Sequence, residues 1–99
     1  MIKRIVKLTF QEDKTDAFIA IFEESKNNIR SSEGCLHLEL LRSNAPDNVF
    51  FTFSIWESEA HLNQYRHSKL FEETWKKTKI LFSDRPQAWS TQLLSTPDL

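Results

Sequence analysis

The chain has 99 residues, which is the size of one domain, so the sequence predicts a single core. Its 13 basic and 14 acidic residues are scattered and give a net charge of −1, which excludes the strong positive field of polyanion-binding proteins. We therefore expect no nucleic-acid partner. The densest basic group, Lys76, Lys77 and Lys79, falls on a predicted helix whose apolar positions face elsewhere, and we interpret it as a solvated face.

The single cysteine and the N-terminal pattern bear on the cell compartment. Cys35 can form no disulfide within the chain, and its position in a strand pattern favours a buried thiol that behaves as a small hydrophobe. Lys3, Arg4 and Lys7 interrupt the first apolar positions, and no apolar run approaches the roughly 20 residues that cross a bilayer. The sequence therefore predicts a cytoplasmic protein with no membrane partner.

The first two elements differ in hydrophobic period. Residues 2–10 alternate between apolar and mostly polar positions, which predicts a strand. Apolar residues then take helical spacing from about residue 14 to 31, with Asp13 or Thr15 as the candidate N-cap. Gly34 supplies a permissive backbone shortly after the helix ends.

Two further strands follow as a predicted hairpin. Residues 35–42 alternate, with three leucines (Leu36, Leu38, Leu40) opposite Cys35, His37, Glu39 and Leu41. Residues 49–56 form the second strand, and the turn formers of residues 43–48 connect the pair.

The last third predicts a helix and a final strand. Ser58 can cap a helix that continues to about Phe82, with a break near Ser68, and the Asp-Arg-Pro sequence after it stops the helix. Residues 87–94 predict the last strand, and residues 95–99 a loose tail.

The order strand, helix, strand, strand, helix, strand is typical of an α+β, ferredoxin-like βαββαβ fold with an antiparallel sheet and both helices on one face. We expect one such domain over residues 1–94. Phe50, Phe51 and Phe53 put aromatic rings on both faces of one strand, and Leu41 and Trp89 add further apolar candidates. Neither face can stay fully wet without a large apolar patch, so the sequence predicts a homodimer.

Most standard reaction sites lack their residues in this sequence. One glycine in the chain is incompatible with a phosphate-binding loop, so no nucleotide or flavin is expected. His37 and Glu39 share one side of a strand, but no third metal ligand accompanies them. His61 and Tyr65 share a helical face, and we interpret them as a packing or hydrogen-bonding pair. No cofactor and no metal are predicted.

What remains is a set of aromatic side chains that suits a flat, apolar molecule. Trp56, Tyr65, Phe71 and Trp75 lie on the last hairpin strand and the second helix, on the sides that should meet. Core packing is the favoured interpretation of Phe71 and Trp75. For Trp56 and Tyr65, core packing and ligand contact are equally supported, because both carry a polar group that needs a partner.

The chain resembles the antibiotic biosynthesis monooxygenase family of dimeric α+β barrels from its first strand to Leu94. The matching residues are Glu33-Gly34-Cys35-Leu36 at the start of a strand, Trp56 and Ser58 at the end of the next strand, and Ser68 and Phe71 in the second helix. The resemblance implies a cofactor-independent oxygenase. In such enzymes the substrate, once deprotonated in a mostly apolar pocket, itself supplies electrons to O2.

The resemblance also suggests site residues. It implies Trp56, Tyr65 and His37 as catalytic residues, and a substrate-binding set of Trp56, Tyr65, Arg66, Phe71 and Trp75. Trp56 matches the family's tryptophan and would line the pocket, whereas His37, Tyr65 or Arg66 would orient or polarise a phenol.

Several positions depart from the family pattern. Tyr65 stands where many relatives carry a histidine in the second helix, and Leu70 where a second histidine often precedes the phenylalanine. Trp75 occupies the position of the haem-ligating histidine of the haem-degrading branch, and Lys7 that of its first-strand asparagine. Haem cleavage is therefore not expected.

The sequence thus predicts a homodimeric monooxygenase that acts on a small aromatic or quinol-type substrate. The alternatives are a non-catalytic small-molecule binding or stress-response protein of the same fold, and a structural protein whose aromatic residues simply pack.

Overall fold

The computed structural model describes all of residues 1–99 and contains four strands, three α-helices and one 3-10 turn. In chain order these are β1 (Ile2–Thr9), η1 (Glu12–Lys14), α1 (Thr15–Arg30), β2 (Cys35–Arg42), β3 (Val49–Trp56), α2 (Glu59–Arg66), α3 (Lys69–Lys79) and β4 (Gln87–Thr91). The longest helix has 16 residues, and none is long and apolar enough to cross a membrane.

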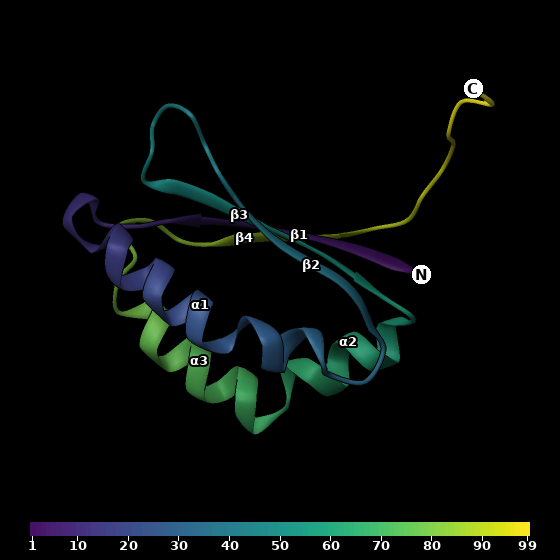
Figure 1. Ribbon diagram of the computed structural model, residues 1–99, viewed down its shortest axis with the longest axis horizontal. Helices are drawn as coiled ribbons and strands as arrows, with labels where there is room; N and C mark the ends of the chain where they lie inside the picture. Colours follow the sequence, from purple (N-terminus) through teal and green to yellow (C-terminus); the bar gives the residue numbers. More distant parts are fainter.

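The strands form one antiparallel sheet in the order β2-β3-β1-β4, and the helices cover one face of it (Figure 1). This arrangement confirms the predicted α+β, ferredoxin-like fold. Residues 92–99 contain no helix or strand and extend away from the body of the molecule (Figure 1).

Serine caps define the two helices that follow the hairpin. Ser58 Oγ accepts a hydrogen bond from the His61 backbone N–H at 3.2 Å, and Ser68 Oγ accepts one from the Phe71 N–H at 3.1 Å. Each hydroxyl satisfies a donor that the first helical turn would leave unpaired. The predicted cap at Ser58 and the predicted break near Ser68 are therefore confirmed.

The start of α1 differs from the prediction, because no side chain caps it. Asp13 lies inside η1, and Thr15 is the first residue of α1. The chain enters the helix through the 3-10 turn, in which the Lys14 N–H donates to the Gln11 carbonyl at 2.9 Å. A 3-10 turn is a common way to begin an α-helix without a side-chain cap.

The second helical region and the last strand end three residues earlier than predicted. Phe82 forms a β-bridge with Phe10, and the Leu81 carbonyl accepts a hydrogen bond from the Gln11 N–H at 3.0 Å, so these residues cannot continue α3. At the other end, Thr91 of β4 pairs with Lys3, which is only one residue from the start of β1. Beyond Thr91, β1 therefore offers almost no further residues with which β4 could pair.

A β-bulge changes the side on which β2 begins. Cys35 pairs with Trp56 and His37 with Ile55, so Leu36 is the extra residue. The bulge turns Cys35 toward the helices, where it is buried, and leaves the Leu36 side chain exposed. The predicted alternation holds from His37 onward but is wrong for Cys35 and Leu36.

On the helix-facing side of the sheet, the side chains are large at the two ends of the strands and small in the middle. Along β3 this side carries Phe50, Thr52, Ser54 and Trp56 in that order. The two aromatic residues belong to separate buried clusters, one with Leu8, Phe10, Phe18, Phe50 and Leu81, and one with Ile2, Cys35, Trp56 and Leu62. The small polar residues between the clusters leave space above the centre of the sheet.

The opposite face of the sheet has no helix over it (Figure 1). Phe53, Ile5 and Trp89 are aligned in register across β3, β1 and β4 on this face. Trp89 is 46% exposed, and Leu41, which pairs with Phe51, is 47% exposed. An apolar row of this kind is unusual on a water-facing surface and typical of an interface.

Candidate functional site

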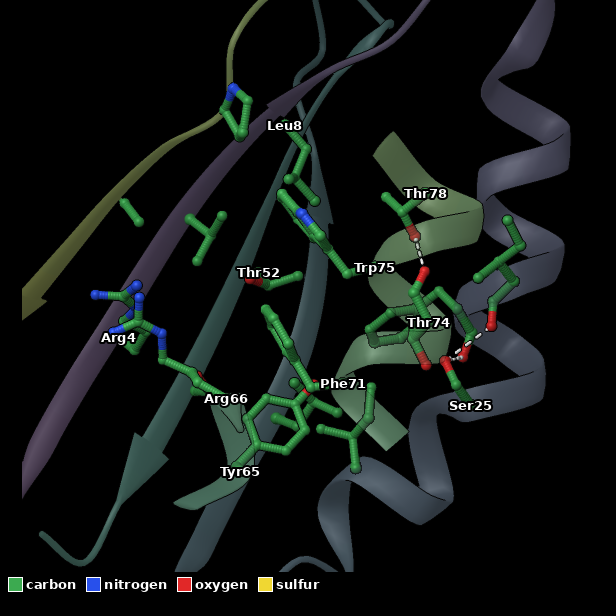
Figure 2. A pocket seen from close by; sticks show the side chains of 18 of the residues that line it. Arg4, Leu8, Ser25, Thr52, Tyr65, Arg66, Phe71, Thr74, Trp75 and Thr78 are labelled. Carbon is green, nitrogen blue, oxygen red and sulfur yellow. Dashed lines mark hydrogen bonds between the residues drawn. The ribbon is translucent and has the colours of Figure 1, made fainter. Parts of the chain in front are cut away.

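A cavity of about 300 Å³ lies between the centre of the sheet and the helices (Figure 2). Thirteen of its 21 lining residues are hydrophobic, and none is Asp, Glu, His or Cys. The volume is at the lower end of the range for small-molecule sites, roughly 300 to 1,000 Å³. Its walls therefore suit a compact, mostly apolar ligand.

Stacked aromatic rings form one wall of the cavity. The Trp56 and Tyr65 rings stack with centroids 4.9 Å apart, and Tyr65 meets the edge of Phe71 at 5.3 Å. Phe71 in turn lies parallel to Trp75 at 5.8 Å. The series connects β3, α2 and α3, and such ring pairs stabilise a fixed wall by about 0.5 to 1.5 kcal/mol each.

Trp56 is the most deeply buried member of this wall. Its side chain is 1% exposed, and its Nε1–H donates to Ser54 Oγ at 3.0 Å. The indole N–H is thus already satisfied within the protein, so it is not free to bind a ligand. Trp56 contributes shape and packing to the cavity.

Tyr65 differs from Trp56 because its hydroxyl forms no hydrogen bond with another residue. The ring is largely buried between Trp56 and Phe71, and the cavity is the space beside it (Figure 2). Burial raises the pKa of Tyr65 far above its ordinary value of 10.0, and Cys35 raises it further. At neutral pH the residue is therefore a hydrogen-bond donor and not a base.

Two arginines from opposite walls lie at one end of the cavity. Arg4 is on β1 and its Nη1 donates to Ser90 Oγ of β4 at 2.9 Å, whereas Arg66 ends α2 and extends toward Arg4 (Figure 2). Burial lowers the pKa of Arg4, and the positive charge of Arg66 lowers it further. Neither guanidinium has a carboxylate within 4.0 Å, so both charges are uncompensated.

The remaining polar side-chain groups of the cavity are hydroxyls and the indole N–H of Trp75, which forms no hydrogen bond within the chain. Ser25 Oγ donates to the Ile21 carbonyl at 2.8 Å, and Thr78 Oγ1 donates to the Thr74 carbonyl at 2.8 Å, so these two are occupied within their own helices. The Thr52 hydroxyl has no partner in the chain and lies near the centre of the cavity (Figure 2). Thr52 and Tyr65 thus offer free hydroxyls to a ligand.

The structure brings five of the six candidate residues to this cavity, namely Trp56, Tyr65, Arg66, Phe71 and Trp75. His37 is not among them, because it lies on the face of the sheet away from the helices. There its Nε2 is 3.1 Å from Glu39 Oε2, and its ring is 5.7 Å from that of Phe53.

Arg4 and Thr52 are candidate site residues that sequence reasoning missed, and Arg4 carried the clearer signal. It shares the helix-facing side of β1 with Ile2, Val6 and Leu8, and an arginine in an otherwise apolar row was the available signal. A charged side chain in that position needs a partner or a functional reason.

His61 does not pair with Tyr65 as the helical spacing suggested. Its Nδ1 lies 2.7 Å from Ser58 Oγ, and its ring packs against Gly34, which has a φ of 81°. The Ser58 hydroxyl also caps α2, so this serine and histidine hold the junction of β2 and α2 together. Neither residue lines the cavity.

Other reactive groups are similarly removed from the cavity. Cys35 is buried in the second core cluster, where burial raises the pKa of its thiol, so it stays in the unreactive protonated form. No group of three His, Cys, Asp or Glu side chains is placed to hold a metal ion.

The fold and the cavity put the chain among small ferredoxin-like α+β proteins with an apolar space between sheet and helices. Residues 1–77 match the sequence model of the antibiotic biosynthesis monooxygenase family. The match covers most of the chain, which therefore belongs to this family.

Individual relatives are distant in sequence. An uncharacterised protein from Synechocystis is 28% identical over 71 residues, which are 72% of this chain and 48% of that protein, so the chain spans about half the length of this curated relative. A Nitrosomonas europaea structure that carries the family name has a TM-score of 0.89 at 14% identity, covering 96% of this chain and 100% of the other. One from Bordetella bronchiseptica has a TM-score of 0.85 at 22% identity, covering 95% and 97%. These similarities show a shared fold.

Proposed function

We propose that the protein is a monooxygenase that oxidises a small aromatic, quinol-type or anthrone-type compound without a cofactor. Family membership supports the reaction class. The observation that carries the proposal is the cavity itself, whose lining combines aromatic rings, a protonated phenol and a free hydroxyl with two arginines, Arg4 and the exposed Arg66, that have no carboxylate partner. Such surroundings hold a flat molecule and favour its anion over its neutral form.

The proposed chemistry begins with loss of a proton from the substrate. No cavity residue is a carboxylate, imidazole or thiolate, so the proton passes to water, and the positive potential of Arg4 and Arg66 lowers the substrate's pKa. Tyr65 Oη–H and Thr52 Oγ1–H donate to the resulting oxyanion. Trp56, Phe71 and Trp75 position the ring system.

The electron-rich anion then supplies electrons to O2. With an anthrone, a new C–O bond forms at the ring carbon that has lost its proton, giving a peroxide. Cleavage of the O–O bond and loss of the second C–H leave a carbonyl, and the second oxygen atom departs as water. The carbon loses four electrons and O2 gains four, so the balance requires no external reductant.

Oxygen uptake tests this proposal directly. Metal-free protein would be mixed with a panel of reduced naphthoquinols and anthrones, with correction for autoxidation, and compared with Tyr65→Phe. We expect protein-dependent uptake that falls strongly in this variant. Trp89→Phe, a change of one aromatic residue on the opposite face of the sheet, is the matched control and should retain the uptake.

A second candidate function is binding of a small molecule without turnover. It is favoured by one observation, namely that the cavity contains no side chain able to accept a proton at neutral pH. Under this alternative, the same quinols would bind and quench the fluorescence of Trp56 and Trp75, but no oxygen would be consumed.

We also propose that two copies of the chain associate through their uncovered sheet faces. The aligned apolar side chains of Phe53, Ile5 and Trp89 support this arrangement, as does the small core, since only 14 of 99 residues are buried in the single chain. Light scattering at micromolar concentration should give the mass of a dimer. A stable monomer would contradict the proposal.

A further inference from the structure

The charge of the cavity is unbalanced in one direction. Arg4 and Arg66 contribute two guanidinium groups, and none of the 21 lining residues is acidic. Arginine stays protonated in proteins, so neither charge can be removed by titration. Arg4 is partly withdrawn from water, so its unpaired charge gains from an anionic partner, whereas Arg66 is exposed and brings a second positive charge to the mouth of the cavity.

The two guanidinium groups retain most of their hydrogen-bonding capacity. Arg4 uses one N–H to reach Ser90, and the Arg66 guanidinium forms no hydrogen bond within the chain. Because Arg4 comes from the sheet and Arg66 from α2, their remaining donors approach the same end of the cavity from two sides (Figure 2). Planar guanidinium groups in this arrangement suit a carboxylate, which has two acceptor oxygens.

The rest of the cavity is apolar. Along β1, Leu8 lies four residues beyond Arg4, which corresponds to about 13 Å in an extended strand. The far end is closed by Leu8, Phe18 and Trp75. The cavity is therefore polarised, with a cationic end and an apolar body.

From this polarity we infer that the cavity binds aromatic acids, with the carboxylate held by Arg4 and Arg66 and the ring system directed toward Leu8 and Trp75. This inference rests on the proposed use of the cavity as a substrate site, and it specifies the substrate class as acidic. The acid is a permanent anionic group, separate from the phenol or C–H that reacts.

Binding of 2-naphthoate and of its uncharged isostere 2-naphthamide tests the inference without any turnover. Titration calorimetry on the unmodified protein should show about tenfold or greater preference for the acid, because hydrogen bonds to a charged group are strong. Added salt should weaken binding of the acid and leave the amide unchanged.

Variants assign the preference to the two arginines. In Arg66→Gln, and more fully in the Arg4→Gln/Arg66→Gln double variant, the acid should lose its advantage and bind no more tightly than the amide. Lys77→Gln removes an exposed positive charge from the outer side of α3 and should keep the full preference.

Equal binding of acid and amide by the unmodified protein, or binding of neither, would overturn the inference. Its failure is distinguishable from failure of the proposed function. Acid preference without oxygen uptake would refute the oxygenase and leave the inference standing. Oxygen uptake with neutral quinols and no acid preference would support the oxygenase and refute the inference.

Discussion

The Tyr65→Phe substitution separates a functional role of this residue from a structural one. The hydroxyl forms no hydrogen bond within the chain, while the ring stacks on Trp56 and meets Phe71. Phenylalanine keeps both ring contacts and leaves no partner unsatisfied. The free energy of unfolding at pH 7 should therefore change by no more than about 0.5 kcal/mol.

The same substitution should reduce turnover strongly. If the Tyr65 hydroxyl donates to an oxyanion, its loss removes a hydrogen bond to a charged group, worth about 2 kcal/mol, which corresponds to a fall of about 30-fold in kcat. Urea unfolding measures the first quantity and oxygen uptake the second. A variant that is destabilised by more than about 1 kcal/mol and has unchanged turnover would refute the assignment.

The pKa of Tyr65 supplies an independent check. Burial raises this pKa above the ordinary value of 10.0, and Tyr65 is the one tyrosine in the chain. The preference for the protonated form therefore contributes fully to stability below pH 10, and stability declines as the pH rises beyond that point, where only the unfolded chain ionises. Tyr65→Phe should lack the part of the alkaline decline that Tyr65 contributes and keep the part due to the raised pKa of Cys35. Phenolate absorbance that appears at pH 10 in the folded protein would contradict the burial argument.

Three other substitutions test the surrounding structure. Trp56→Phe removes the hydrogen bond to Ser54 and leaves a void, so urea unfolding should show a loss of about 2 to 3 kcal/mol; an unchanged midpoint would contradict the burial of Trp56. Gly34→Ala puts a side chain at a positive φ and places its Cβ 2.3 Å from His61 Cγ, so the free energy of unfolding should fall by about 3 kcal/mol. Adding His61→Ala should restore the part of this loss that is due to the clash. Phe53→Glu puts a charge at the centre of the uncovered face and should shift the mass from dimer to monomer in light scattering, whereas a persistent dimer would place the interface elsewhere.

Local patterns predicted most of the fold because they record which side of an element is buried. The bounds of β2 and β3 were predicted on this basis, and the cap at Ser58 and the break near Ser68 were predicted from the local sequence. The bulge at Leu36 and the end of α3 before Phe82 were not, since each depends on a partner distant in the sequence. Trp56 sets the pairing at the start of β2, and Phe10 holds Phe82 in a β-bridge.

The candidate site residues that lie on predicted apolar faces could be recognised from the sequence, whereas those that depend on distant parts of the chain could not. Tyr65, Phe71 and Trp75 lie on helical faces that the hydrophobic period turns toward the sheet, and all three line the cavity. His37 was suggested by the family resemblance, although the alternation of β2 places it opposite Leu38. The apolar row of β1 marks Arg4 as unusual, but its place beside Arg66 depends on the position of α2, which no pattern within β1 encodes.

The absence of a proton-accepting side chain from the cavity has a consequence for kinetics. If the substrate ionises by releasing its proton to water, the lower limb of the pH–rate profile reports the pKa of the bound substrate and not that of an enzyme group. A series of substrates with graded acidity should therefore shift this limb in parallel with their own pKa values. For this cavity, the choice of substrate would set the working pH range.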